Sequence, residues 1–373
     1  MITREQSPVN LELPFATLDG FITPNERFYV RTHFPIPQLD TKSFRLKIEG
    51  AAETPFELSY DELLKMEMQT ITATLECAGN GRAFLRPPPD ATLWELGAVG
   101  NAEWTGVPLA AVLERAGLKT AAAEVILEGV DQGEVKQPPR PVGKIHYARS
   151  LPRAKAYRDV LLATEMNGAA LSPAHGFPLR AIVPGWYGAA SVKWLARILV
   201  SDQPFAGYFQ TVDYSYWDRR NGLPMLLPIQ GLLVKAEIAR PAIAEVLPPS
   251  TKYRVHGTAW TSDSEITKVE FSDNLGVTWQ CARIIGQPMR NAWQLWEFDW
   301  LTPAQPCRAT LLARATDARG RTQPELHDPD FGPYLINHCL PMEVEVRAPA
   351  RSPCATRSLT VETDARRVLH LPI

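Results

Sequence analysis

The spacing of apolar and polar residues predicts many short strands and few helices in this chain. Ser59 and Glu62 have capping-box spacing and predict that a helix begins there. Pro108 suits the start of a second helix, and Gly117 suits its end. Short apolar runs predict strands at residues 45–48, 125–127, 179–183 and 198–200. The first two-thirds of the chain is therefore expected to be a mixed α+β domain.

The last third of the chain has the alternation of a sheet protein. Trp296, Phe298 and Trp300 repeat at a period of two, as on one face of a strand. Further strands are expected at residues 269–271, 277–279 and 310–315, with a turn at 273–276. This pattern of short strands and turns indicates a β-sandwich.

Length and composition indicate two domains. The chain has 373 residues, 45% of them hydrophobic, which is enough for two buried cores. A proline-rich segment at 240–250 predicts a linker. The expected organisation is an α+β domain at 10–240, a β-sandwich at 250–347 and a weakly ordered tail at 348–373.

Charge and cysteine usage narrow the function classes. The formal net charge of −2 gives no general attraction to nucleic acid or to an anionic membrane, so neither partner is expected. No apolar run reaches membrane-spanning length, and the first residues lead into no signal-type core. The five cysteines are dispersed, with no zinc-like spacing: Cys77, Cys281, Cys307, Cys339 and Cys354. We therefore expect a cytoplasmic protein from a reducing compartment.

One segment combines a cysteine, a glycine-rich turn and an arginine: Leu75-Glu76-Cys77-Ala78-Gly79-Asn80-Gly81-Arg82. The thiolate of Cys77 suits a soft metal. Gly79 and Gly81 let the backbone come close to whatever the cysteine binds, and they can adopt positive φ angles without strain. Arg82 suits an anionic oxo-acid, because its guanidinium is a permanent cation with a planar set of donors. The alternative for Cys77, judged on this segment alone, is a buried small hydrophobic residue.

A series of further segments gives the cysteine its context. They lie in this order around it: 28–37 (FYVRTHFPIP), Trp94, 103–109 (EWTGVPL), 128–131 (EGVD), 165–168 (EMNG), 175–180 (HGFPLR), 183–188 (VPGWYG) and 191–194 (SVKW). With this series the chain resembles the sulfite oxidase family of molybdenum-cofactor enzymes, from about residue 28 to about residue 345. The resemblance implies a sulfite-oxidase-like molybdopterin domain, followed by an immunoglobulin-like β-sandwich that forms a homodimer.

The resemblance also implies roles for individual residues. Cys77 would be the protein ligand of the molybdenum in a molybdopterin cofactor. The positions that resemble the oxyanion pocket are Arg31, Arg82, Trp94 and Tyr214. The positions that resemble the pterin-binding set are Tyr29, His33, Asp131, Ser150, His175, Arg180, Ser191 and Lys193. The alternatives are salt bridges for the arginines, core packing for Trp94 and Tyr214, and loop-fixing hydrogen bonds for the pterin set.

The implied activity is oxidation of sulfite to sulfate by oxygen-atom transfer. The chain lacks the haem and flavin domains of some relatives, so electrons are expected to pass to an external acceptor. Gly81 stands where many relatives have a second arginine, and residues 331–339 hold no arginine where one is usual. This loss of positive charge leaves another small oxyanion or sulfur compound open as substrate. Two further alternatives are a reductase of nitrate or an S- or N-oxide, and a cofactor-free dimeric scaffold.

Overall fold

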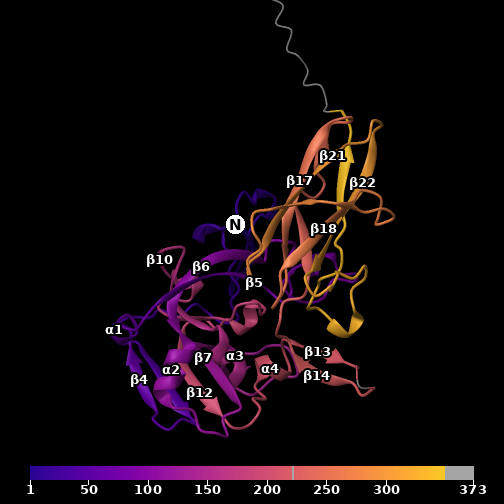
Figure 1. Ribbon diagram of the computed structural model, residues 1–373. Helices are drawn as coiled ribbons and strands as arrows, with labels where there is room; N and C mark the ends of the chain where they lie inside the picture. The colour runs from indigo at the N-terminus through magenta and orange to yellow at the C-terminus, as the bar shows by residue number, and fades with distance from the viewer. Residues whose placement is uncertain (221, 349–373) are drawn as a thin grey trace, which may run out of the picture.

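The structure, a computed structural model, is rich in strands and has few helices (Figure 1). It describes residues 1–220 and 222–348. The predicted tail therefore lies, except for its first residue, outside the described residues. Figure 1 shows an N-terminal α+β part and, above it, the C-terminal sheets.

Two five-stranded sheets form the N-terminal part. The first has the order β10 (Ala169–Ala170), β9 (Leu161–Met166), β6 (Val99–Pro108) and β5 (Gln69–Glu76), with β11 (Arg180–Ile182) paired to β9. The second has the order β4 (Phe56–Ser59), β3 (Arg45–Gly50), β12 (Leu195–Ser201), β7 (Glu124–Glu134) and β8 (Lys144–Pro152). In the second sheet β12 runs parallel to β3 and antiparallel to β7. All four strands predicted in this part lie within these sheets.

Two hairpins and several short helices complete this part. The hairpins are β1 (Ile2–Gln6) with β2 (Val9–Glu12), and β13 (Ser215–Asp218) with β14 (Met225–Pro228). The α-helices are α1 (Tyr60–Leu63), α2 (Leu109–Ala116), α3 (Arg153–Arg158) and α4 (Tyr208–Thr211). The 3-10 helices of this part are η1 (Phe15–Thr17), η2 (Asn25–Arg27), η3 (Arg82–Phe84), η4 (Pro173–His175) and η5 (Gly188–Ala190), and η6 (Pro329–Phe331) lies in the C-terminal half.

Both predicted helices are confirmed. The Ser59 side chain accepts from the backbone of Glu62, whose carboxylate accepts in return from the Ser59 backbone, so the capping box starts α1. Gly117 follows α2 with a positive φ of 64°, as expected for a residue that ends a helix. The helices α3 and α4 were not predicted, because each is too short to show a helical period.

The C-terminal half contains two packed sheets. One has the order β15 (Lys235–Arg240), β17 (Lys252–Trp260), β21 (Gln294–Leu301) and β20 (Arg283–Ile285). The other has the order β16 (Val246–Leu247), β23 (Met342–Val346), β22 (Cys307–Asp317), β18 (Ile266–Ser272) and β19 (Gln280–Cys281). Because β15 pairs with β17, the predicted linker at 240–250 connects two strands of one sheet. Trp296 and Trp300 are buried, in agreement with the predicted alternation along β21.

The strand predicted at residues 277–279 is wrong. The side chain of Asn274 accepts a hydrogen bond from the backbone N–H of Thr278 (3.0 Å), and Gly276 has a φ of +81°. These contacts hold the segment in a compact loop, and β19 begins only at Gln280. Val277, which alternation would place on a sheet face, is 80% exposed.

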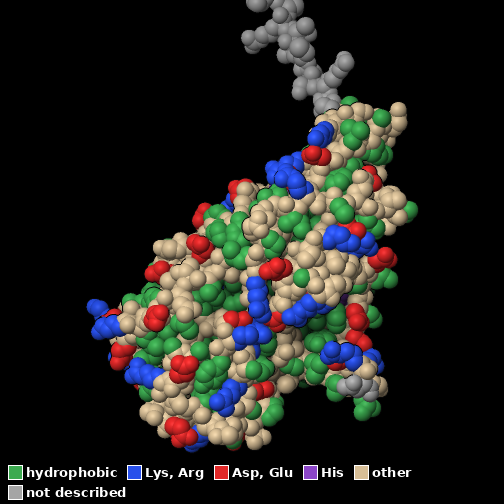
Figure 2. Space-filling model, viewed as in Figure 1, with side chains coloured by type: hydrophobic (Ala, Val, Ile, Leu, Met, Phe, Trp, Pro, Cys, Tyr) green, Lys and Arg blue, Asp and Glu red, His purple; other side chains and the backbone are tan. Residues whose placement is uncertain are grey.

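The apolar residues form two buried clusters, and the charged residues of both signs are mixed on the visible surface. One large apolar cluster extends through both halves, and a smaller one around Phe28, Trp94 and Trp104 includes Cys77. On the face in Figure 2, basic and acidic side chains alternate and no broad patch of one sign forms. Because the net charge is −2, any strong attraction for an anion must come from a local group of charges. Among the helices of residues 1–220 and 222–348, none has the length and apolarity needed to cross a membrane.

Candidate functional site

Cys77 lies directly after β5, where the strand gives way to a tight turn. Its backbone N–H donates to the carbonyl of Ala98 (2.9 Å), which extends the pairing of β5 with β6 by one residue. Asn80 N–H then donates to the Cys77 carbonyl (2.9 Å) and closes the turn. The turn therefore fixes the backbone from which the thiol projects.

The two glycines of this turn have different tasks. Gly81 has a φ of +100°, as predicted for it. Gly79 does not use this freedom, since its φ is not positive. A Cβ on Gly79 would lie 2.2 Å from Cζ of Arg82, so its missing side chain makes room for the guanidinium. The guanidinium of Arg82 thus packs against Gly79, two residues after Cys77 in the same turn.

A cavity opens at Cys77, and together with the open space at its mouth it has a volume of about 650 Å³. Ten of the predicted site residues line it: Tyr29, Arg31, His33, Cys77, Asp131, His175, Arg180, Ser191, Lys193 and Tyr214. They come from β7, β11, η4 and the loops around them, and they span almost 190 positions of sequence. The fold therefore brings together groups that no local sequence pattern places side by side.

Three residues that line this cavity each have a buried polar atom without a partner in the protein. Nε of Arg31, Nε of Arg180 and Oδ1 of Asp131 are in this state. A buried polar atom without a partner costs about 1–3 kcal/mol, so a ligand with both donors and acceptors would be stabilised here. Cations suit phosphate, and a carboxylate suits ring amines. The residues present therefore fit a phosphate-bearing pterin.

The metal side of the fit depends on one sulfur. Within residues 1–220 and 222–348, no three or more His, Cys, Asp or Glu side chains are grouped so that they could hold a metal ion. A metal at Cys77 would therefore need further ligands from a cofactor. A dithiolene-bearing pterin supplies such ligands, and thiolates suit a soft centre.

Burial shifts the protonation of the groups around the cavity. It lowers the pKa of His175 to about 4, with Arg180 as the next cause. It also lowers the pKa of His33 well below its usual value, helped by Arg31 and Lys193. Both histidines are therefore neutral at pH 7. Burial raises the pKa of Asp131 to about 6, so this carboxyl is mainly ionised at pH 7.

Tyr214 and His33 form a hydrogen-bonded pair beside the cavity. Nε2 of His33 lies 2.7 Å from the hydroxyl of Tyr214. Tyr214 has a φ of 55°, an uncommon conformation for a bulky residue. Burial raises the pKa of the Tyr214 hydroxyl, so it keeps its proton near neutrality. In the tautomer with a proton on Nε2 of His33, the hydroxyl proton of Tyr214 is free for a ligand.

A second, outer cavity adjoins the first and shares Arg31 and His33 with it. Arg82 lines only this outer cavity. Its Nε donates to the carbonyl of Pro333 (2.8 Å), and its guanidinium lies 4.7 Å from the ring centre of Tyr334. Four acidic residues also line this cavity: Glu5, Asp90, Glu134 and Asp213. Arg31, Arg82 and Lys136 are its cations, so the acidic side chains that line the outer cavity outnumber the basic ones by four to three.

Sequence reasoning missed Tyr334 and Asp213. The hydroxyl of Tyr334 donates to a carboxylate oxygen of Asp213, and the rings of Tyr334 and Tyr214 lie 5.2 Å apart. Tyr334 belongs to the segment 331–339, which holds no arginine. That absence was the one feature of the sequence that could have drawn attention to Tyr334. Asp213 precedes a predicted site residue, but nothing in the sequence pairs it with a tyrosine 121 positions away.

Two predicted site residues line neither cavity. Trp94 is fully buried in the apolar cluster that contains Phe28 and Cys77. Ser150 lies on β8, where its backbone N–H donates to the side chain of Gln210 (3.3 Å) and its hydroxyl has no partner. Contact of Trp94 and Ser150 with a ligand therefore stays a prediction, and the location of Trp94 favours the packing alternative.

Comparison with known proteins gives consistent matches over both halves. Residues 33–209 match the oxidoreductase molybdopterin binding domain, and residues 227–330 match the Mo-co oxidoreductase dimerisation domain. The chain is similar to mitochondrial sulfite oxidase of Mus musculus, with 34% identity over 340 residues that cover 86% of this chain and 60% of that protein. With sulfite oxidase of Gallus gallus it shares 34% identity over 344 residues, which cover 86% of this chain and 72% of that protein.

A solved structure matches the whole fold. The sulfane dehydrogenase SoxCD from Paracoccus pantotrophus superimposes with a TM-score of 0.79 at 27% identity. The match covers 93% of this chain and 89% of that chain. The mouse protein is longer, and this chain spans less than two-thirds of its length.

Proposed function

Because the chain belongs to the sulfite oxidase family of molybdenum-cofactor oxidoreductases, we propose that it oxidises sulfite to sulfate. The observation that supports this most directly is the position of Cys77 in the wall of a buried cavity that also holds Arg31 and Tyr214. When bound there, the molybdenum cofactor supplies two-electron oxygen-atom transfer. The electrons pass to an external acceptor.

We assign the residues of the inner cavity to binding and orientation. The Cys77 thiolate is the protein's ligand to the metal. The guanidinium of Arg180, the amine of Lys193 and the carboxylate of Asp131 hold the pterin and its phosphate, together with Tyr29, His33, His175 and Ser191. Ser150 belongs to this set only by resemblance, since it lies outside the cavity wall.

We assign the oxyanion to the junction of the two cavities. Sulfite is small, charged and strongly hydrated, so it needs charge-assisted donors once it leaves water. Arg31 lines both cavities and Arg82 lines the outer one, so a ligand at their junction can meet both guanidinium groups. Tyr214 adds a neutral donor on the inner side. Trp94 would act only by packing behind Cys77.

A second sulfur substrate is supported by the outer cavity. Tyr334 covers the face of the Arg82 guanidinium and donates to Asp213. Four carboxylates near this point weaken the attraction for a dianion. A sulfur compound with less charge than sulfite would therefore bind with less electrostatic cost. The solved relative is itself named a sulfane dehydrogenase.

Assembly and location complete the proposal. The dimerisation domain supports a homodimer, and its two packed sheets support an immunoglobulin-like topology. Light scattering should then give twice the chain mass of 41.5 kDa.

We propose the cytoplasm as the location, although the mammalian relatives are named mitochondrial. Fractionation of cells that express the protein tests this directly.

The first experiment is to measure molybdenum per chain by plasma mass spectrometry, on protein from a host that makes the cofactor. Near-stoichiometric metal is expected. The same sample should reduce a dye with sulfite and should not consume nitrate with reduced viologen. Nitrate consumption without sulfite oxidation would identify a reductase. A folded dimer without metal would identify a scaffold and overturn the proposed function.

A further inference from the structure

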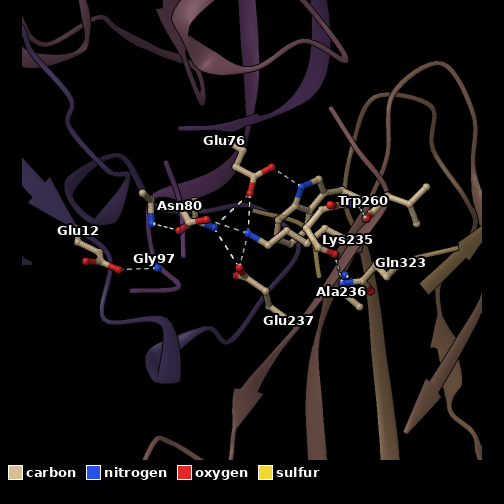
Figure 3. Close-up of polar contacts among 12 residues, drawn as sticks. Glu12, Glu76, Asn80, Gly97, Lys235, Ala236, Glu237, Trp260 and Gln323 are labelled. Atoms are coloured by element: carbon tan, nitrogen blue, oxygen red, sulfur yellow. Dashed lines mark hydrogen bonds and ion pairs between the residues drawn. The ribbon is translucent and has the colours of Figure 1, made fainter. Parts of the chain in front are cut away.

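A buried ionic cluster joins the cysteine turn to the C-terminal sheets. It consists of Glu76, Asn80, Lys235, Glu237 and Trp260, which we call the bridging cluster (Figure 3). Each of the five is at most 2% exposed. Glu76 and Asn80 flank Cys77, whereas Lys235 and Glu237 lie on β15 and Trp260 lies on β17. Two halves of the chain therefore meet at the residues on either side of the thiol.

Lys235 is the centre of the bridging cluster. Its Nζ lies 2.9 Å from Oε1 of Glu76 and 2.8 Å from Oε1 of Glu237. It also donates to the backbone carbonyl of Asn80 (3.2 Å). Lys235 therefore holds the turn at both ends, through a side chain one residue before Cys77 and a carbonyl three residues after it.

The remaining contacts restrict the same two residues. Oε2 of Glu76 accepts from the indole N–H of Trp260 (2.8 Å). The Asn80 amide donates to Oε1 of Glu237 (3.1 Å), and its Oδ1 accepts from the backbone of Ala98 (3.0 Å). Figure 3 shows these groups converging on Lys235. Both carboxylate oxygens of Glu76 are thus occupied, which leaves its side chain one orientation.

The bridging cluster is also fixed on the side away from Cys77. Gln323 accepts from the backbone N–H groups of Ala236 on β15 and Ala315 on β22, each at 2.8 Å. Its amide donates to the carbonyl of Asn337 (3.0 Å). The strand that carries Lys235 is therefore tied to the opposite sheet and to the segment 331–339. Movement in the C-terminal half would reach the cysteine turn through this strand.

Stability alone does not account for such a cluster. Removing Lys235 and Glu76 from water costs several kcal/mol per ion, and their mutual attraction offsets this cost only in good geometry. Burial raises the pKa of Glu237 to about 8, so this third member is mainly protonated at pH 7. Apolar residues of similar volume often stabilise a core as well or better. What an apolar replacement could not supply is directional contact at both ends of the turn. Groups that hydrogen-bond around a metal ligand orient it and tune its metal.

We infer that Lys235 is a positioning residue, which orients the Cys77 thiolate for the metal through Glu76 and Asn80. The C-terminal half thereby takes part in the metal site although it contributes no ligand. This inference rests on the proposed role of Cys77 as ligand. It implies that the bridging cluster affects the environment of the metal as well as the stability of the chain.

The test compares Lys235→Met with the matched control Lys155→Met. Lys155 is also buried, with Asp159 at 2.6 Å and the carbonyl of Pro184 at 2.8 Å, but none of these partners flanks Cys77. Each protein is purified from the cofactor-producing host. Molybdenum content, the g-values of the Mo(V) electron paramagnetic resonance signal and the urea midpoint of the cofactor-free chain are measured.

Lys235→Met should shift the Mo(V) g-values and lower the affinity for the cofactor about tenfold. Lys155→Met should lower the urea midpoint but leave the g-values and the metal content unchanged. If Lys235→Met is too unstable to purify, Trp260→Phe removes the indole donor to Glu76, keeps an aromatic ring there and should give a smaller shift of the same kind. Unchanged g-values and metal content in a folded Lys235→Met or Trp260→Phe protein would overturn the positioning role.

A parallel sample separates this inference from the proposed function. Cys77→Ser should abolish the wild-type Mo(V) signal if the thiolate is the ligand. If Cys77→Ser retains that signal, the ligand assignment itself fails, whatever Lys235→Met does. If Cys77→Ser loses the signal and Lys235→Met keeps it unchanged, only the positioning role fails.

Discussion

His175 is expected to make the stability of the cofactor-free chain depend on pH below neutrality. The ring is 6% exposed, and its Nε2 lies 3.1 Å from the carbonyl oxygen of Asn25. Burial, followed by the charge of Arg180, lowers its pKa from 6.5 to about 4. Between these two values the unfolded chain binds a proton that the folded chain does not. Acid therefore favours unfolding, and stability is lost as the pH falls from about 6.5 to about 4.

The size of the effect follows from the same two values. One pKa unit corresponds to about 1.4 kcal/mol, so the full shift contributes about 3 kcal/mol to the free energy of unfolding. His33 also has a lowered pKa and adds its own loss in acid. The contribution of His175 must therefore be taken as a difference between two proteins. His175→Gln removes the titrating ring and keeps a donor for the carbonyl of Asn25.

The assay is urea unfolding of the wild-type chain and His175→Gln at several values between pH 7.5 and pH 4.5. The wild-type chain should lose about 2–3 kcal/mol more than the variant over this range. The two proteins should have parallel curves above pH 7, where the ring is neutral in both states. Parallel curves over the whole range would refute the reasoning, since His175 would then titrate alike in the folded and unfolded chain.

Three substitutions test two residues of the site and the packing behind it. Cys77→Ser should abolish sulfite-dependent dye reduction and change the free energy of unfolding by less than about 1 kcal/mol, because the two side chains are of similar size. A variant with normal turnover would contradict the ligand assignment. Arg82→Ala should raise KM for sulfite about 10–100-fold with a smaller change in kcat, from the loss of a charged donor; an unchanged KM would remove it from the substrate pocket. Gly100→Ala should cost about 1–3 kcal/mol in urea unfolding, because its Cβ would lie 2.6 Å from the ring of Phe28. Equal stability of this variant would show that the ring can move aside.

Part of this fold could be predicted because neighbouring residues determine it. The capping box at Ser59 and the glycine after α2 act within one helical turn. The alternation of Trp296, Phe298 and Trp300 follows from the two-residue period of a strand. The same limit explains the failure at 277–279, where one side-chain contact from Asn274 holds a loop. Periodicity does not register such a contact.

The candidate site also has features that neighbouring residues determine and features that depend on tertiary packing. The motif around Cys77 predicted the thiol, the turn and the neighbouring arginine, since these lie within six positions of one another. Whether Trp94 contacts a ligand stays a prediction, because its ring lies in the apolar cluster with Cys77 and its indole N–H has no partner in the protein. The contact of Tyr334 with Asp213 depends on the C-terminal half lying against the outer cavity.

The sequence by itself determined the short-range chemistry of this protein: the elements that caps and alternation specify, and a family motif that names a cofactor. Only the tertiary structure decided which distant groups share one buried space. Lys235 lies 159 positions from Glu76, and no local pattern pairs them. The physical reason is that a buried charge is costly unless it is paired, and its partners can come from any part of the chain that packs against it. The position of Lys235 beside Glu76 therefore depends on how the whole chain packs.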